Sequence, residues 1–443
     1  MTAAIRILPC GPVVGHIQPP GSKSLSNRAL VLAALAEGTS TLTGVLDSED
    51  TRVMLEAWAK LGVRISGDPA GGRLSVEGCG GRLPVKKADL FIGNSGTSIR
   101  FLTAALSACD GEFTLDGIER MRQRPIGDLL RALAQLGGRA ESLNSALPDC
   151  PPVRVRADGL TGGTARVAGN ISSQYLSGLM MAAPLAKSRV RLEVEGELVS
   201  VPYVTMTAQV MSSFAATVAG PACGPILIEP TGYRATDYAI EPDASAASYF
   251  WAAAAITGGD VTVDALSASS LQGDVRFCEV LAQMGCKLQA GPQSMRIIGR
   301  PLHGVDVDMS DISDTVQSLS AVALFAEGST RVRGVAHNRH KETDRIADLA
   351  RELRKFGARV DEHADGLTIW PPEKNQSGEV VVETYNDHRM AMSLALTGLR
   401  RSGVVILDPD CTAKTYPLFW QDLAKITKTS LERIDSWVDV HVD

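Results

Sequence analysis

Hydrophobic and polar positions along this chain form a block that recurs. Each block runs from a glycine into a short strand of alternating apolar residues, then through a turn into a helix with leucines at helical spacing. In the first half, strands at 38–44 and 111–117 lead to helices that end before Gly62 and Gly137. A glycine just past a helix is typical of a left-handed C-terminal cap.

The second half repeats the pattern. Strands at 259–263 and 328–334 lead to helices that end before Gly285 and Gly357, and weaker copies fit 194–218 and 404–426. Equivalent glycines lie about 70 residues apart, which predicts six units, three in each half, with a boundary near 239–243. Strands alternating with helices favour an α/β fold in which each unit is a β/α subdomain. The strand at 5–9 precedes the first unit, and we expect it to pair within the second half.

Composition narrows the class of protein. A chain of 443 residues exceeds what one hydrophobic core usually serves, so two domains are expected. The net charge of −6, without any Lys/Arg-rich run, argues against nucleic acid as a partner. The sequence has neither the build of a secretory signal nor an apolar stretch of membrane-spanning length, so we expect a cytoplasmic protein that does not bind membranes.

The sulfur and imidazole side chains are scattered. Eight cysteines and seven histidines occur without a Cys-x-x-Cys pair or a neighbouring set that would complete a metal site. We therefore predict free cysteines that are buried or partly buried, and no metal requirement.

A Gly/Ser-rich turn at 20–28 carries the first candidate chemistry. Lys23 and Arg28 stand where this turn enters an apolar helix, so backbone N–H groups, the helix dipole and two full charges converge. This arrangement predicts an anion site, although such turns also serve only to cap helices. The spacing of a P-loop is absent, so a nucleoside triphosphate is not implied.

Other segments place basic or hydrogen-bonding groups at turns or helix starts: 93–100, 122–128, 171–175, 340–345, 385–392 and 408–415. Alone, each fits a capped helix, an exposed arginine or a surface ion pair. Pro125 would be the first residue of a helix, and Lys341 and Arg345 would share one face if their segment is helical. Together, cations at such positions in both halves of an acidic protein predict two anionic groups bound in a cleft between the halves.

At these positions the chain resembles the 5-enolpyruvylshikimate-3-phosphate synthases, which are enolpyruvyl transferases. The likeness covers nearly the whole length, in family order, at 20–28, 93–100, 124–128, 172–174, 197–203, 243–250, 341–345, 386–392 and 408–414. It implies an inside-out α/β barrel of two similar domains, each made of three βαβαββ units, with the active site in the interdomain cleft. The domains would be 21–240, which mainly binds shikimate 3-phosphate, and 1–20 plus 241–443, which contributes phosphoenolpyruvate binding and catalysis.

The resemblance also implies a reaction. The enolpyruvyl group of phosphoenolpyruvate passes to the 5-hydroxyl of shikimate 3-phosphate through a tetrahedral adduct, and phosphate is released. Such a site must protonate a methylene carbon, deprotonate a hydroxyl and then reverse the first step. No cofactor is implied, and a monomer is expected.

Site residues follow by motif match. Shikimate 3-phosphate would be bound by Ser24, Arg28, Ser172, Ser173, Ser200 and Lys341; phosphoenolpyruvate by Gly96, Arg124, Arg345, Arg389 and Lys414; both by Lys23 and Gln174. Asn94 and His337 are further substrate-binding candidates. Asp314 would accept the hydroxyl proton and Glu342 would donate to carbon, with Lys23 also in the catalytic set; Asp311 is the rival base.

Two departures and two rivals complete the interpretation. Phe101 stands where the family usually has proline, and His337 where it often has asparagine. A UDP-N-acetylglucosamine enolpyruvyl transferase would carry a loop cysteine, which 124–127 lacks. A non-catalytic phosphate-binding scaffold would not require Asp314 and Glu342.

Overall fold

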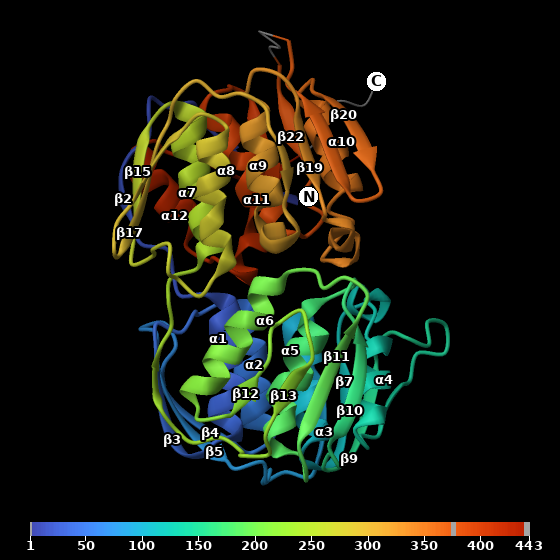
Figure 1. Cartoon of the computed structure of the whole chain (residues 1–443). Coiled ribbons are helices and arrows are strands. Elements are labelled where there is room, and N and C mark those ends of the chain that lie inside the picture. The colour runs from blue at the N-terminus through green and yellow to red at the C-terminus, as the bar shows by residue number, and fades with distance from the viewer. Residues whose placement is uncertain (1, 374–377, 438–443) are drawn as a thin grey trace. The chain divides into compact units, whose positions relative to one another are not determined.

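The computed structural model describes residues 2–373 and 378–437, and the chain divides into two compact units (Figure 1). The continuous unit is Gly21–Glu241. The split unit combines Met1–Pro20 with Pro242–Asp443.

Across the described residues, six four-stranded sheets share one topology. In each, a parallel pair of strands is followed by two antiparallel neighbours. For example, β6 (Lys87–Phe91) is parallel to β7 (Asp110–Asp116), which is antiparallel to β9 (Val153–Asp158), and β8 (Ala140–Ser142) lies at the far edge. The predicted α/β class and the six repeating units are confirmed.

Three of the sheets belong to the continuous unit. Besides β6–β9 they are, in spatial order, β14 (Asp237–Ala239), β3 (Glu37–Thr43), β5 (Arg73–Cys79) and β4 (Arg64–Asp68), and then β10 (Gly163–Ala168), β11 (Val190–Glu195), β13 (Ile226–Ile228) and β12 (Val218–Ala219). All partners of these strands lie within the same unit.

The first two strands of the chain complete two sheets of the split unit. Its sheets are β16 (Lys287–Ala290), β17 (Ser294–Ile298), β15 (Asp260–Asp264) and β2 (Val14–Ile17); β18 (Asp306–Asp308), β19 (Thr330–Arg333), β21 (Gly366–Trp370) and β20 (Arg359–His363); and β22 (Val380–Val382), β23 (Val404–Leu407), β1 (Thr2–Ile7) and β24 (Glu432–Trp437). The first strand therefore pairs with two of the last ones, as expected from the sequence.

Buried helices form the centre of each unit. They are α1 (Lys23–Leu35), α3 (Gly96–Ser107) and α5 (Ser173–Ala182) in the continuous unit, and α7 (Ala244–Thr257), α9 (Val316–Ala323) and α11 (His388–Ala395) in the split unit. Every residue of α3 is buried, as is α7 up to Ile256. A helix apolar on all sides is stable only inside a core, which places these helices between the sheets. Within each unit they pack on one another.

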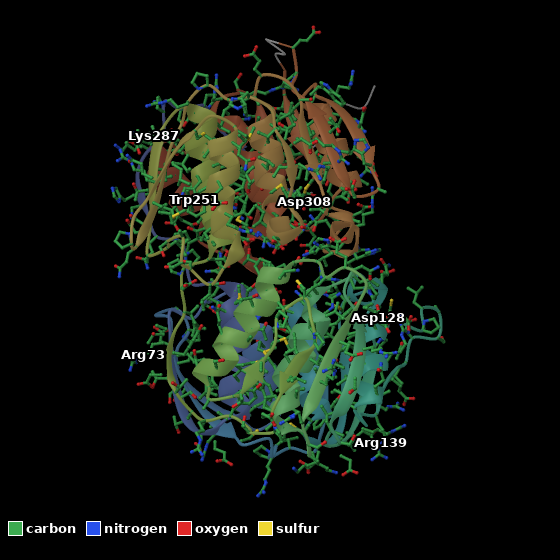
Figure 2. All side chains as sticks on the ribbon, in the orientation of Figure 1. Arg73, Asp128, Arg139, Trp251, Lys287 and Asp308 are labelled. Carbon is green, nitrogen blue, oxygen red and sulfur yellow. The ribbon has the colours of Figure 1, made fainter. Side chains whose placement is uncertain are left out.

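The remaining helices cover the outside of the units: α2 (Glu49–Lys60), α4 (Gly127–Gln135), α6 (Val201–Ser213), α8 (Phe277–Gln283), α10 (Ala347–Lys355) and α12 (Phe419–Thr427). Figure 2 shows Trp251 inside the split unit and Lys287 at its surface. The Trp251 indole is fully buried and donates to the Met295 carbonyl (3.1 Å).

Local expectations from the sequence can be checked in this fold. The glycines predicted to follow helices, Gly62, Gly137, Gly285 and Gly357, all have positive φ, as the left-handed cap requires. All eight cysteines are free; seven are buried or half-buried as expected, whereas Cys223 is exposed. Among the described helices, none combines the length and apolar character needed to cross a bilayer.

Candidate functional site

Several of the predicted motifs lie where central helices begin. In the continuous unit, Ser22, Ser95 and Ser172 are the N-cap residues of α1, α3 and α5, and each side chain accepts a backbone N–H of its helix. In the split unit, Asp243 and Asp387 cap α7 and α11 in the same way. Positive helix ends therefore gather within each unit beside the predicted cations.

Arg28 is a buried guanidinium in the continuous unit. It donates to Thr207 Oγ1 (2.7 Å), Ser177 Oγ (3.2 Å) and the Ser24 carbonyl (3.0 Å), and it stacks over the Phe101 ring at 5.1 Å. Burial lowers its pKa to about 10. Within the described residues no carboxylate forms an ion pair with Arg28, so its charge is available to an anion.

Gln174 is held by α3. Its Oε1 accepts from Arg100 Nη1 (2.6 Å), and its Nε2 donates to Thr97 Oγ1 (3.2 Å). Arg100 also stacks over Tyr175 at 5.2 Å. These contacts fix the amide of Gln174 beside Ser173, which is buried at the start of α5.

Arg124 lies against the first turn of α3. Its Nη1 donates to the Asn94 carbonyl (3.1 Å), and only 4% of the residue is exposed. A Cβ added at Gly96 would stand 2.5 Å from Arg124 Nη2. Glycine at 96 is therefore what allows a guanidinium to sit on the positive end of this helix.

The other candidates of this unit lie at helix starts as well. Lys23, the first residue of α1, is paired with Asp50 of α2 (3.4 Å). Ser200 precedes α6 in the left-handed conformation (φ 57°, ψ 46°), which is uncommon for a residue other than glycine. A non-glycine residue in this conformation points to a constrained position.

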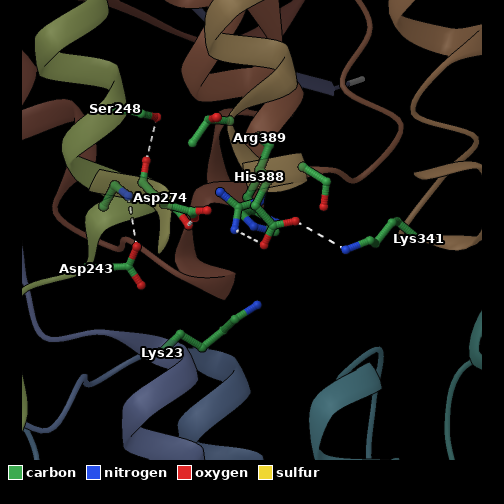
Figure 3. A network of polar contacts seen from close by, with 12 residues as sticks. Lys23, Asp243, Ser248, Asp274, Lys341, His388 and Arg389 are labelled. Atoms are coloured by element: carbon green, nitrogen blue, oxygen red, sulfur yellow. Dashed lines mark hydrogen bonds and ion pairs between the residues drawn. The ribbon is translucent and has the colours of Figure 1, made fainter. Parts of the chain in front are cut away.

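In the split unit, Asp314 joins three cations. Its carboxylate lies 3.3 Å from Lys341 Nζ, 3.3 Å from Arg345 Nη1 and 2.7 Å from Arg389 Nη2. Figure 3 shows the side chains of Lys341 and Arg389 pointing toward one another. Asp311, the rival base, is instead paired with Arg276 (2.8 Å) and is 37% exposed. Asp314 thus contacts three cations, whereas Asp311 contacts one at the surface.

Arg345 is the centre of the same cluster. It forms two hydrogen bonds to Asp387 (2.6 and 3.2 Å) and one ion pair to Glu342 (2.8 Å). Glu342 also contacts Lys414 (3.0 Å). The side chains of Arg345 and Asp387 are 2% and 0% exposed. We call these residues the cation cluster: Asp314, Lys341, Glu342, Arg345, Asp387, Arg389 and Lys414.

Burial and the charges of this cluster shift the pKa values of Lys341 and Arg345 within it and of His337 beside it. Burial lowers the pKa of Lys341, opposed by Asp314. For Arg345, burial is outweighed by the carboxylates of Asp387, Glu342 and Asp314, so its pKa is raised. Burial, reinforced by Lys341, lowers the pKa of His337 to about 3. His337 is therefore neutral at physiological pH.

His337 should make the protein less stable in acid. Between pH 6.5 and 3 the unfolded chain binds a proton at His337 that the folded chain does not, so stability falls as pH falls. At pH 5 the loss is about 2 kcal/mol at 1.36 kcal/mol per pH unit. His337→Asn should lose less stability between pH 7 and 5 in urea unfolding. The exposed His303→Asn should behave like the wild type, and an equal loss in all three proteins would contradict this origin.

Some sequence expectations do not hold. The segment from Lys341 to Arg345 lies between a 3₁₀ helix (Ala336–His340) and α10, so these cations do not share a helical face; both instead reach Asp314. Helix α4 begins at Gly127, so Pro125 is not its first residue. Asp387, Asp50 and Arg100 were not predicted as site residues. Asp387 carried a signal, because it precedes an apolar helix within the 385–392 motif.

Comparisons by family model, by sequence and by structure all match this chain to the same family. The family model for EPSP synthase (3-phosphoshikimate 1-carboxyvinyltransferase) matches residues 7–423. The chain is 45% identical to the chloroplastic 3-phosphoshikimate 1-carboxyvinyltransferase of Arabidopsis thaliana, covering 96% of this chain and 84% of that one. It is 44% identical to the enzyme of Marinomonas sp., covering 94% and 98%. A solved EPSP synthase structure from Acinetobacter baumannii superimposes with a TM-score of 0.80 at 28% identity, covering 98% of this chain and 100% of that chain.

Proposed function

Because this chain belongs to the EPSP synthase (3-phosphoshikimate 1-carboxyvinyltransferase) family, we propose which of its side chains carry out the family's reaction. The enzyme transfers the enolpyruvyl group of phosphoenolpyruvate to the 5-hydroxyl of shikimate 3-phosphate and releases phosphate. The observation that carries the assignment is the cation cluster: Asp314 and Glu342 are buried or nearly so, and each contacts at least two cations.

Phosphoenolpyruvate would bind through Arg345, Arg389 and Lys414 of the split unit and Arg124, beside Gly96 and Asn94, of the continuous unit. The ligand has a carboxylate and a phosphate, and planar guanidinium groups bind both through paired hydrogen bonds. Buried cations strengthen this attraction, because less water screens their charge. Arg124 is supported by its burial and by the lack of an ion-paired carboxylate among the described residues.

Shikimate 3-phosphate would bind through Arg28, Lys341 and the polar groups at the starts of α1, α5 and α6. Arg28 supplies a buried guanidinium for the phosphate, and Ser24, Ser172, Ser173 and Ser200 supply hydroxyls. Gln174, fixed by Arg100, and Lys23, held by Asp50, would contact both ligands. His337, which is buried and neutral, would contact shikimate 3-phosphate through its ring.

The proton steps follow from the two carboxylates. In the addition, Asp314 takes the proton of the 5-hydroxyl, and the oxygen of this hydroxyl bonds to C2 of phosphoenolpyruvate. Glu342 gives a proton to C3. In the elimination, the new methyl group returns a proton to Glu342 and the bond from C2 to the phosphate oxygen breaks. The phosphate leaves with the proton taken from the hydroxyl, so Asp314 is ionised again. Lys23 would stabilise the negative charge of that phosphate.

Glu342 needs a proton for the first step, yet Arg345 and Lys414 favour its charged form. We propose that Glu342 becomes protonated when the substrates bind. Anionic groups of phosphoenolpyruvate would take up the hydrogen bonds of Lys414 and Arg345, and Glu342 would then keep a proton in a buried setting.

The assay for this function is phosphate release. We expect release only when phosphoenolpyruvate and shikimate 3-phosphate are both present, and none when UDP-N-acetylglucosamine replaces the latter. Tight binding of both substrates without phosphate release would instead favour a binding scaffold. The monomeric state and cytoplasmic location are part of the proposal, and sedimentation velocity and cell fractionation would test them.

Gly96→Ala should weaken phosphoenolpyruvate binding without unfolding the protein. The three atoms nearest to the new methyl group would all belong to the Arg124 guanidinium, the end of a flexible side chain, so this group moves rather than the backbone. Loss of a charge-assisted hydrogen bond predicts a KM for phosphoenolpyruvate raised about 10- to 100-fold. Gly11→Ala, which meets no atom within 4 Å, is the matched control. An unchanged KM would remove Arg124 from the proposed site.

A further inference from the structure

A cavity lies in the split unit, at the opposite end of the central helices from the cation cluster. It has a volume of about 1320 Å³ and is lined by the last residues of α7, by 324–327 after α9 and by 400–402. Helix α9 starts two residues after Asp314 and ends at Ala323, a rise of about 12 Å. The cavity is therefore separate from the cation cluster.

Three arginines line this cavity: Arg300, Arg400 and Arg401. Within the described residues, none of them forms an ion pair with a carboxylate. They donate hydrogen bonds to the carbonyls of Gly299, Ile256 and Phe356. Burial lowers the pKa of Arg401.

Other arginines of the same unit are different. Arg296 is paired with Asp260, Arg331 with Asp365 and Arg333 with Asp306, each on a sheet surface. Many surface arginines of this acidic chain thus pair with a carboxylate, although the exposed Arg354 and Arg359 of the same unit do not among the described residues. Three unpaired arginines around one cavity leave several guanidinium N–H groups for an anion.

Two of the three arginines, Arg400 and Arg401, are also held in place. Arg400 lies over the Phe325 ring (5.3 Å) and donates to the Ile256 carbonyl (3.0 Å). Arg401 lies over Phe356 (5.6 Å) and donates to its carbonyl (3.1 Å). Each guanidinium is anchored by one ring and one hydrogen bond, so little side-chain entropy is left to lose on binding.

The rest of the lining limits the kind of ligand. Leu302, Phe325 and Pro371 supply apolar surface, which suits an organic body. Glu327 and Glu373 also line the cavity, so its ionisable groups are three arginines against two glutamates. A polyphosphate would be repelled by the glutamates, whereas one anionic group on an apolar body fits both features.

We propose that this arginine-lined cavity is a second ligand site, which binds a small organic molecule with one carboxylate or phosphate group and an apolar body. The probe is benzoate, titrated into the full chain and followed by calorimetry. Arg400→Gln/Arg401→Gln should weaken its binding on the order of tenfold or more, since two charge-assisted hydrogen bonds are lost. Arg296→Gln, a paired arginine outside the cavity, should leave the Kd unchanged.

Two further variants keep the test decisive if the double variant does not fold. Ser402→Asp places a carboxylate on the exposed rim and should weaken binding, while Glu327→Gln removes one and should strengthen it. Arg389→Gln should leave the Kd unchanged. Two results would overturn the proposal. Loss of benzoate binding only in Arg389→Gln would place benzoate at the cation cluster. Equal binding in every variant would exclude the side chains of the cavity.

Discussion

Asp314→Asn should lower kcat about 100- to 10,000-fold, the range that a positioned general base contributes. Asparagine keeps the shape of the side chain but cannot accept the hydroxyl proton. Lys341, Arg345 and Arg389 would also lose the charge they share, yet these are binding groups, so their disturbance would raise KM. Steady-state kinetics at saturating concentrations of both substrates separates the two effects.

The control lies three residues earlier. Asp311→Asn removes a half-exposed carboxylate paired with Arg276, and kcat should change less than about twofold, as expected for a surface ion pair. A normal kcat with a raised KM in Asp314→Asn would leave this residue with a positioning role alone. Circular dichroism at the assay temperature must show both variants fully folded.

Asp387→Asn should cause the largest loss of stability. The carboxylate is fully buried and forms two hydrogen bonds to Arg345, which is itself 2% exposed. Breaking a buried ion pair by removing one charge costs about 3–5 kcal/mol, because the remaining charge stays buried. Asparagine can still cap α11, as aspartate does through Arg389 N–H, so the loss would report the ion pair and not the cap.

Urea unfolding measures this difference directly. Asp306→Asn is the matched control, because its partner Arg333 is at the surface and the two side chains are 64% and 44% exposed. The control should lose less than about 1 kcal/mol. A similarly small loss in Asp387→Asn would mean that Glu342 and Asp314 alone neutralise Arg345.

Much of the fold could be predicted from the sequence, because local rules and repetition agree. Gly62 and Gly357 marked helix ends through a conformation that other residues adopt at a cost, and alternating strands around them gave the six units. The pairing of the first strand with the second half followed because this strand stands outside the first unit.

The candidate site was predicted less completely. Cations at turns and helix starts stand out in an acidic chain, so Arg124, Arg345 and Arg389 could be named as candidates from the sequence. Their partners were missed, because an aspartate such as Asp387 reads as a helix cap in sequence and becomes an ion-pair partner only through packing. The contact of Arg28 with Phe101 joins two helices, which no local pattern reveals.

The position of β1 has a consequence for biosynthesis. Every strand of the continuous unit has its partners once residue 239 has left the ribosome, whereas β1, translated first, must wait for β23 and β24. At about 5–20 residues per second this wait lasts roughly 20 to 85 seconds. During that interval the nascent chain exposes an unpaired strand edge, which is covered only when its own later residues have been made. Chaperones that recognise extended segments can bind this edge during the interval.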